Sequence, residues 1–292
     1  MKPITKKDLA QIEGCETANI IESNFALSFM FLPKDKCSAI TSIYTLCSYI
    51  DDIVDSSDNL FLLEVEQKEK RMKFWQDTIL DIYYGNPVSP LLEPLAWTIR
   101  KYNIPISKIE VLFDGISKDL RKRDYDTIED MLDYCYGVAG IVGLICLNIF
   151  GDTSDSASKY AVSLGYALQI TNIMRDVRDD AQRSYRYIPE ELLTKYHYNA
   201  TDVTPKTYNT RFIAVMKELG GLAESYYIKA DSYLALLPKK RLMLASEIMK
   251  NTYHTILDEI INNNYNVLTN KKIKLSKFKK IGIALKTIVK LK

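Results

Sequence analysis

Helical periodicity runs through almost the whole 292-residue chain and restricts its fold more than any other feature. Apolar residues recur at intervals of three and four, whereas the alternation of apolar and polar residues that indicates strands is hard to find. The sequence has only 11 glycines and 9 prolines, so few positions would interrupt a helix. We therefore predict an all-α fold. No linker-like segment exceeds a loop, which favours a single domain over residues 1–292.

The predicted helices follow from this periodicity and from the prolines and glycines that bound it. No internal repeat is found apart from a pattern of acidic residues described below. With boundaries good to about three residues, the helices are expected at 36–55, 60–84, 89–102, 105–120, 127–150, 154–182, 208–236, 239–266 and 275–290.

Composition disfavours several classes of function. The net charge of +2 gives no overall field for binding nucleic acid. The only histidines, His197 and His254, make histidine-ligated zinc sites and histidine general bases poor explanations. The five cysteines are odd in number and form no Cys-x-x-Cys, which is typical of small core residues in a reducing cytoplasm. The N-terminus lacks an apolar signal segment, and the apolar run near 138–150 is too short to span a bilayer, so we expect a soluble, cytoplasmic protein.

The first acidic motif is "DDIVD" at 51–55, in an apolar helical neighbourhood. Asp51 and Asp55 are four residues apart and share a helix face, while Asp52 lies about 100° around the axis. Considered by itself, this motif is more simply a solvated helix end that runs into the turn "SSDN".

A second acidic motif, "NIMRDVRDD" at 172–180, changes that interpretation. Asn172, Asp176 and Asp180 again stack on one helix face, with Arg175 next to them and Asp179 beside the stripe. Mg²⁺ prefers such oxygen ligands, uses one or two carboxylates per ion and completes its shell with water and phosphate oxygens. Two facing stripes therefore predict Mg²⁺ ions that bind a diphosphate and neutralise it as a leaving group. No Walker loop or Gly-x-Gly-x-x-Gly is present, so the diphosphate is not expected to belong to a nucleotide.

The segment "YCYGVAGIVG" at 134–143 places small residues on successive turns of an apolar helix. Gly137, Gly140 and Gly143 are compatible either with close helix packing or with room for a ligand chain. Tyr134, together with Tyr44 before the first acidic motif, would supply aromatic faces. An aromatic, apolar cavity capped by Mg²⁺ suits a prenyl chain whose departing diphosphate leaves a carbocation.

The tail at 271–292 is a basic amphipathic segment with nine lysines and no acidic residue. Its apolar residues Phe278, Ile281, Leu285 and Ile288 are spaced as one helical face. The simpler prediction is a terminal helix that packs this face on the core with its lysines in water. The alternative is a peripheral contact with anionic lipid at the inner face of the membrane, where a lipophilic product could be released.

These segments together resemble the squalene/phytoene synthase family, head-to-head prenyl-diphosphate synthases with an all-α isoprenoid-synthase fold. The resemblance runs from about residue 20 to 285 and is greatest to the bacterial dehydrosqualene (4,4'-diapophytoene) synthases. The matching segments are "IYTLCSYIDDIVD" at 43–55, "YCYGVAGIVG" at 134–143, and "LGYALQITNIMRDVRDD" at 164–180 followed by "YIPEELL".

The resemblance implies a helical bundle around a central cavity, in a prenyltransferase that joins two farnesyl diphosphates through presqualene diphosphate. The product would be dehydrosqualene, made for C30 carotenoid biosynthesis with release of diphosphate and without NADPH. The alternatives are a phytoene synthase, which uses two geranylgeranyl diphosphates, and a squalene synthase, which adds NADPH. A different class is a non-catalytic, membrane-associated partner subunit. We expect a monomer or homodimer that binds no nucleic acid.

The resemblance also assigns site residues. Two to three Mg²⁺ ions would be held by Asp51, Asp55, Asn172, Asp176 and Asp180. The catalytic set adds Tyr134 and Arg175, the latter contacting diphosphate. Substrate binding falls, together with Asn172, on Tyr44, Ser48, Val138, Ala139, Gly143, Gln169, Tyr187 and Tyr253.

Departures from the family pattern concern mainly arginines. Ser48, Tyr185 and Asn270 stand where the family has Arg, and Asn24 stands where a Ser is common. Arg183 and Arg186 are candidates to replace the arginine at Tyr185, and Lys271 is a candidate beside Asn270. Because each lost arginine removes a bidentate phosphate contact, we expect an altered affinity for one diphosphate but unchanged metal binding.

Overall fold

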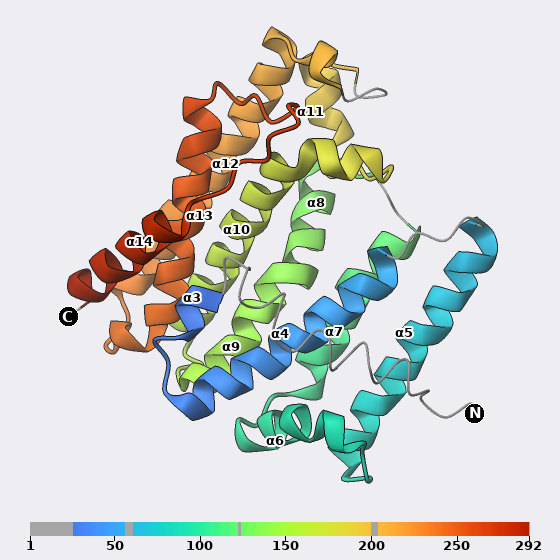
Figure 1. Cartoon of the computed structure of the whole chain (residues 1–292), viewed down its shortest axis with the longest axis vertical. Coiled ribbons are helices and arrows are strands. Elements are labelled where there is room, and N and C mark those ends of the chain that lie inside the picture. The colour runs from blue at the N-terminus through green and yellow to red at the C-terminus, as the bar shows by residue number, and fades with distance from the viewer. Residues whose placement is uncertain (1–25, 56–60, 122–123, 200–203, 292) are drawn as a thin grey trace.

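The computed structural model describes residues 26–55, 61–121, 124–199 and 204–291, and the described part is helical throughout, without a strand (Figure 1). One isolated parallel bridge joins Asp124 to Arg186. The predicted all-α fold is confirmed. The α-helices are α3 (Ala26–Phe29), α4 (Lys34–Asp55), α5 (Phe61–Tyr84), α6 (Glu93–Lys101), α7 (Ile106–Arg121), α8 (Ile128–Cys135), α9 (Ile141–Phe150), α10 (Asp155–Gln182), α11 (Glu190–Lys195), α12 (Thr210–Ala235), α13 (Leu244–Asn262) and α14 (Lys277–Lys290).

Short helical turns complete the elements and account for most differences from the predicted boundaries. The predicted helix at 127–150 is continuous, but its middle is a π-helical turn, η2 (Tyr136–Gly140). The predicted starts at 89 and 239 are 3₁₀ turns, η1 (Pro90–Leu92) and η4 (Lys240–Met243), and a third turn is η3 (Pro205–Thr207). The short helices α3 and α11 were not predicted, because four and six residues are too few to establish a period.

Side-chain caps fix where the helices around the centre begin. Thr127 and Asp130 form a reciprocal capping box at the start of α8. Ser154 accepts a hydrogen bond from the backbone N–H of Ala157 at the start of α10. Gly151 ends α9 in the left-handed region, with φ of 86°. The turn between α9 and α10 is therefore determined locally, and it returns α10 antiparallel along the helix that precedes it.

The long helix α10 is the centre of the bundle. It packs most extensively against α12 and also contacts α9, η2 and α13. On the other side of η2 lies α7, which in turn packs on α4 and α5, and α4 also contacts α9. This arrangement brings the ends of α4 and α10 that carry the acidic motifs toward one space.

Glycines allow the closest helix contacts around η2. A Cβ atom built on Gly137 would lie 2.8 Å from Gly115 Cα of α7, and one built on Gly165 of α10 would lie 2.7 Å from Gly140 Cα. Gly143 faces α10 as well, since its Cβ would lie 3.0 Å from the carbonyl oxygen of Ala161. The sequence left two interpretations open for the glycine-rich segment. Close helix packing is the one observed for Gly137, Gly140 and Gly143.

The helical segment Ile128–Phe150 is long and apolar enough to cross a bilayer by length and composition, and within the described ranges it is the only one. The apolar run near 138–150 was predicted to be too short to span a bilayer. That prediction does not hold for the complete helical segment, which has 23 residues. In the fold, however, the segment lies between α7 and α10, and Cys135, Ile145 and Ile149 are fully buried. These contacts are those of a central core helix. The four described cysteines are free, and Cys135 is buried whereas Cys37, Cys47 and Cys146 are half-buried.

The C-terminal helix α14 exists as predicted but packs by a different face. Ala284 and Thr287 are buried, and Asn251 of α13 donates a hydrogen bond to Thr287 Oγ1 at 2.8 Å. Phe278 is 87% exposed and Leu285 56% exposed. The prediction that the face with Phe278 packs on the core is therefore wrong, because the smaller side chains allow α14 to approach α13 more closely.

Candidate active site

A cavity of about 320 Å³ lies between the acidic ends of α4 and α10, with further walls from α7, from the segment α8–η2 and from the loop after α10. The structure brings eight of the predicted site residues to its wall. They are Asp51, Tyr134, Val138, Gln169, Asn172, Asp176, Asp180 and Tyr187. Residues that come from four separate stretches of sequence therefore share one space, as the paired acidic motifs predicted.

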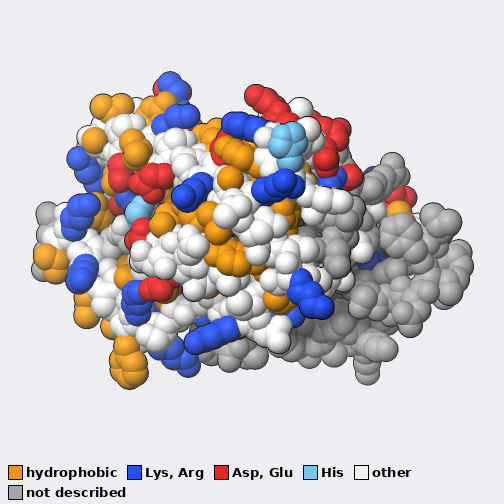
Figure 2. All heavy atoms as spheres, turned by 90° about the horizontal axis from the view of Figure 1, so that it is seen from above, with side chains coloured by type: hydrophobic (Ala, Val, Ile, Leu, Met, Phe, Trp, Pro, Cys, Tyr) orange, Lys and Arg blue, Asp and Glu red, His pale blue; other side chains and the backbone are white. Residues whose placement is uncertain are grey.

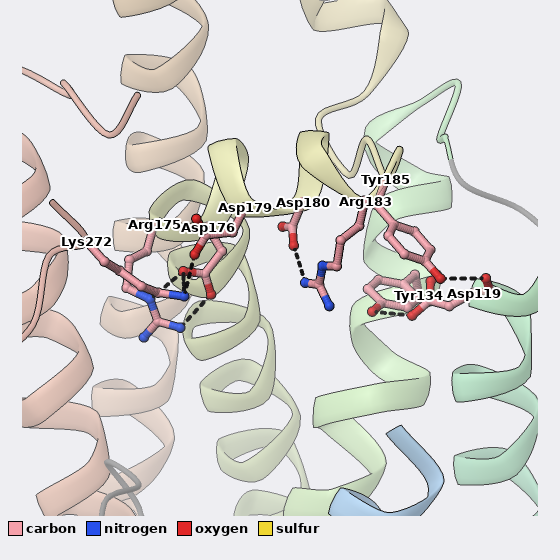
Figure 3. A network of polar contacts seen from close by, with 9 residues as sticks. All are labelled: Asp119, Tyr134, Arg175, Asp176, Asp179, Asp180, Arg183, Tyr185 and Lys272. Carbon is pink, nitrogen blue, oxygen red and sulfur yellow. Dashed lines mark hydrogen bonds and ion pairs between the residues drawn. The ribbon is translucent and has the colours of Figure 1, made fainter. Parts of the chain in front are cut away.

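Asp176 is held by two cationic side chains. Arg175 donates from Nε to Asp176 Oδ1 at 2.8 Å and from Nη2 to Oδ2 at 2.6 Å, a bidentate pair. Lys272, from the segment between α13 and α14, lies 2.8 Å from Asp176 Oδ1 and 3.0 Å from Asp179 Oδ2 (Figure 3). Burial opposes the charge of Asp176, but these bonds outweigh it and lower the pKa of the carboxyl.

Asp180 has the opposite electrostatic balance one turn further along α10. Its carboxylate accepts a hydrogen bond from Arg183 Nη2 at 2.9 Å (Figure 3). Burial, followed by the negative charge of Asp176, nevertheless raises the pKa of Asp180 to about 7. The two carboxylates therefore oppose each other's ionisation, and a cation bound near both would relieve that repulsion.

Asn172 supplies a buried oxygen at the same cavity. Its Oδ1 has no hydrogen-bond donor among the described residues, while its Nδ2 donates to Gln169 Oε1 at 3.5 Å. A buried amide oxygen without a donor is costly unless a ligand or water completes it. Together with the carboxylates of Asp176 and Asp180, this oxygen makes a set of hard donors that fits Mg²⁺.

The described part of the chain contains no three Asp, Glu, His or Cys side chains that already converge on one point. Arg175, Lys272 and Arg183 occupy the carboxylates of α10 instead. An ion of the Mg²⁺ type takes few protein ligands and draws the rest from water and substrate oxygens, so this arrangement remains compatible with the predicted metal site.

The first acidic motif is only partly described. Asp51 is exposed and lines the cavity, whereas Asp52 is exposed and is not part of the cavity wall. Asp55 is the last residue of α4, and its side chain lies outside the described residues, as does Asn24. The role of Asp55 as a metal ligand stays a prediction.

Stacked tyrosines form one wall of the cavity. The rings of Tyr134 and Tyr187 stack with centroids 5.1 Å apart, and the rings of Tyr185 and Tyr187 stack with centroids 5.9 Å apart. Tyr125 packs against Tyr134 at 5.3 Å. Of these four residues, Tyr134 and Tyr187 line the cavity, so they bring aromatic surface close to the acidic stripe.

Asp119 of α7 is a site residue that the sequence analysis missed. It is buried and lines the cavity, and Tyr134 donates its hydroxyl to Asp119 Oδ2 at 2.9 Å (Figure 3). Burial first, and then the Asp119 charge, raise the pKa of Tyr134. A signal was present in the sequence, because Asp119 continues the apolar helix face of Leu112 and Ile116, where an acid is unexpected.

The structure distinguishes the candidates for the lost arginines. Arg183 lines the cavity, whereas Arg186 pairs with Asp124 and Glu190 on the surface. Tyr185, at the position of the family arginine, donates its hydroxyl to the backbone oxygen of Asp119 at 3.3 Å. Near Asn270, the residue that reaches the acidic stripe is Lys272, which the sequence analysis did not single out.

Other predicted residues lie away from the cavity wall. Tyr44 packs edge-on against Phe29 at 6.3 Å, and Ser48 is half-buried. Tyr253 is buried on α13, and it contributes with Asp176 to the raised pKa of Arg175, against the effect of burial. Ala139 and Gly143 are half-buried on the helix that faces α10. Substrate contacts of these five residues stay predictions.

Comparisons with known proteins agree with this geometry. Residues 21–279 match the family described as squalene/phytoene synthase. The chain is 29% identical over 287 residues to a protein of Arthrospira platensis named phytoene synthase, covering 92% of this chain and 89% of that protein. It is 31% identical over 264 residues to a presqualene diphosphate synthase of Rhodopseudomonas palustris, covering 90% and 92%. The crystal structure of a dehydrosqualene synthase in complex with a ligand superimposes with a TM-score of 0.80 at 25% identity, over 99% of both chains.

Proposed function

Because the chain belongs to the squalene/phytoene synthase family, whose members join prenyl diphosphates head to head, we propose that it condenses two farnesyl diphosphates to dehydrosqualene through presqualene diphosphate. The observation that carries the proposal is the single cavity onto which Asp51 of α4 and the Asn172–Asp180 stripe of α10 both open, beside stacked tyrosines. The choice of farnesyl diphosphate is supported by the similarity to a dehydrosqualene synthase over the full length of both chains.

The acidic residues would hold the metal. Asn172 Oδ1, Asp176 and Asp180 would contribute ligands from α10, and Asp51 and Asp55 would contribute ligands from α4. Mg²⁺ bound there supplies the positive charge that stabilises a departing diphosphate. Arg175 already orients Asp176 through two hydrogen bonds, so its first role is to position that carboxylate.

The cationic residues would hold the diphosphate. Arg183 lines the cavity, and Lys272 reaches the same stripe from the segment before α14. Both are bound to carboxylates in the structure, and both would become free to contact phosphate oxygens once a metal ion compensates those carboxylates. They therefore take the part that the family assigns to arginines at Tyr185 and Asn270.

The tyrosine wall would serve the cationic stages of the reaction. When diphosphate departs from the first substrate, the 2,3 double bond of the second attacks the allylic cation, and loss of a proton closes the cyclopropyl ring. Tyr134 and Tyr187, which line the cavity, would place aromatic rings beside the positive charge and exclude water from it. The raised pKa of Tyr134 keeps its phenol protonated, so we assign proton removal to the departed diphosphate.

One observation favours a second candidate, phytoene synthesis from two geranylgeranyl diphosphates. The Arthrospira platensis relative, which aligns with 92% of this chain, carries the name phytoene synthase. The two candidates share the acidic stripes and differ in the length of the prenyl chain that the apolar end must accept.

The deciding experiment is incubation of the purified chain with Mg²⁺ and either farnesyl or geranylgeranyl diphosphate, with and without NADPH. A C30 product with three conjugated double bonds, formed without NADPH, supports dehydrosqualene synthesis. A C40 product supports the second candidate, and squalene formed only with NADPH identifies a reductive enzyme. If neither substrate yields a hydrocarbon or a cyclopropyl diphosphate, the enzymatic proposal fails and a non-catalytic partner subunit replaces it.

A further inference from the structure

The helix α14 turns an apolar stripe toward solvent. Its members are Phe278, Ile281, Leu285 and Val289, with exposed fractions of 87%, 45%, 56% and 70%. At about 100° per residue, these four positions fall within an arc of roughly 80° on the helix. Monomeric soluble proteins rarely leave a contiguous apolar surface without a function, so this stripe requires an explanation.

The packed side of α14 lies opposite the stripe. Ala284 and Thr287 are buried, and Thr287 accepts a hydrogen bond from Asn251 of α13. The helix also contacts α3. Its orientation is therefore fixed by packing against two other helices, and the exposed stripe is not a core face that has been left open.

Lysines border the stripe on both sides. Lys277 lies about 100° from Phe278 on one side, and Lys279, Lys286 and Lys290 lie about 80° to 120° away on the other. Lys279 also forms an ion pair with Glu259 of α13. The segment 271–292 contains nine lysines and no acidic residue. In Figure 2, the left edge of the molecule, where α14 lies in Figure 1, shows Lys or Arg side chains close to hydrophobic ones.

A second exposed apolar segment belongs to the neighbouring helix. Met30 and Phe31 follow α3 directly and are 74% and 38% exposed. Because α3 packs against α14, the two segments lie in the same region of the molecule. Exposed apolar residues from both ends of the described chain therefore lie in neighbouring segments.

We propose that α14 docks in the surface of an anionic lipid bilayer, with Phe278, Ile281, Leu285 and Val289 among the acyl chains. Lysines at both borders would stay at the headgroups, because their long stems let the ammonium remain in the polar layer. This combination of an apolar stripe with basic borders is the pattern of a helix that lies in the membrane plane.

The lysines beside the stripe favour a lipid surface over a second copy of the chain as the partner of α14. A symmetric contact through the same stripe would bring the lysine-rich borders of two α14 helices together. Glu259 of α13 compensates Lys279, but no acidic residue within either segment compensates Lys277, Lys286 and Lys290. Anionic headgroups provide that compensation. Docking would also hold the cavity near the bilayer, since Lys272, just before α14, reaches the acidic stripe.

The test is co-sedimentation of the full-length chain with vesicles. We expect binding to vesicles of phosphatidylcholine with about 30% phosphatidylglycerol, an anionic content that gives the vesicle a clear negative surface potential. Binding should be weak to pure phosphatidylcholine and should decrease with salt. The double variant Phe278→Ser/Leu285→Ser should lower the bound fraction at least about tenfold, since it removes two inserted side chains. The matched control is Ile228→Ser/Leu236→Ser, which removes exposed apolar side chains from α12 and its end and should bind like the unmodified chain.

Insertion is read separately by placing a fluorophore. In Phe278→Trp, vesicles with brominated acyl chains should quench the added fluorescence, whereas Tyr84→Trp, exposed at the end of α5, should not be quenched. Binding without quenching, equal loss in the two double variants, no vesicle binding, or a dimer that dissociates in Phe278→Ser/Leu285→Ser would each overturn the proposal. Because these measurements use no prenyl substrate, they are independent of whether the proposed function is correct.

Discussion

Lys272 Nζ lies 2.8 Å from Asp176 Oδ1, which joins the segment before α14 to the acidic stripe of α10. Lys272 therefore brings a positive charge to the acidic stripe. The family pattern has an arginine two positions earlier in the sequence, at Asn270. Lys272 also occupies a carboxylate that the proposed mechanism assigns to the metal, so it would compete with Mg²⁺ for Asp176 in that mechanism.

Replacing Lys272 should separate these two roles. In Lys272→Met, we expect Mg²⁺ to bind more tightly because its competitor is gone, while inorganic diphosphate binds about 10-fold more weakly through loss of a charge-assisted contact. Isothermal titration measures both affinities. Lys271→Met, an exposed neighbour, is the control. Unchanged affinities in Lys272→Met would mean that the residue only ties the segment to α10.

The acidic stripes should be required for turnover and not for folding. Asp51→Asn and Asp176→Asn should each reduce product formation by more than about 100-fold, because the departing diphosphate loses its metal-borne compensation. Far-ultraviolet circular dichroism should retain the helical signal. Asp77→Asn on the exposed surface of α5 should keep full activity. Unfolding of both site variants would instead assign the stripes a structural role.

The raised pKa of Asp180 predicts a pH dependence of stability. Its pKa is about 7 in the folded chain against 3.8 when unfolded, so between these values the folded state binds more protons. Stability of the metal-free protein should therefore fall as pH rises from about 4 to 7. Melting temperatures measured in EDTA should show a shallower decline for Asp180→Asn, and Mg²⁺ should flatten the decline in the unmodified chain. Parallel curves for the two proteins in EDTA would contradict the shift.

The hydrogen bond between Tyr134 and Asp119 should affect both stability and catalysis. Tyr134→Phe removes a donor from a buried carboxylate and should cost about 1 to 3 kcal/mol of unfolding free energy. Turnover should also fall, because the ring of Tyr134, which lines the cavity, is no longer held by this hydrogen bond. Tyr83→Phe is the matched control, since its hydroxyl donates to Ile104 O at 2.7 Å, away from the cavity. It should lose stability and keep its turnover, whereas equal activities of the two variants would remove Tyr134 from the mechanism.

The glycine contact between α7 and η2 should tolerate no side chain. In Gly137→Ala, the new methyl group would lie 2.8 Å from Gly115 Cα, so we expect a loss of about 1 to 3 kcal/mol from overpacking. Gly221→Ala on α12 has no heavy atom within 4 Å of the new Cβ and should stabilise the helix by up to about 1 kcal/mol. Chemical denaturation measures both, and a neutral Gly137→Ala would show that α7 and η2 can separate.

The sequence predicted those features whose cause lies within a few residues. Helix positions follow from apolar spacing and from caps such as Thr127 with Asp130. The stacking of Asn172, Asp176 and Asp180 follows from the four-residue spacing itself, which needs no knowledge of other helices. For the same reason, the two acidic motifs could be paired as a metal site before the fold was known.

Contacts between distant segments could not be predicted from spacing along a single helix. Asp119 became a site residue only because α7 packs on η2 and brings it to Tyr134. Arg186 is adjacent in sequence to the position of the lost arginine and Arg183 is two residues from it, yet it is Arg183 that lines the cavity, since the chain turns after α10.

The sequence by itself thus determined an all-helical chain with two acidic stripes, because these properties depend on spacing along one helix. The tertiary structure decided which cation pairs with Asp176 and which side of α14 faces outward. Helical periodicity identifies the apolar stripe of Phe278, but burial depends on how closely two helices approach. Ala284 and Thr287 allow the closer approach to α13, so the larger apolar side chains remain at the surface.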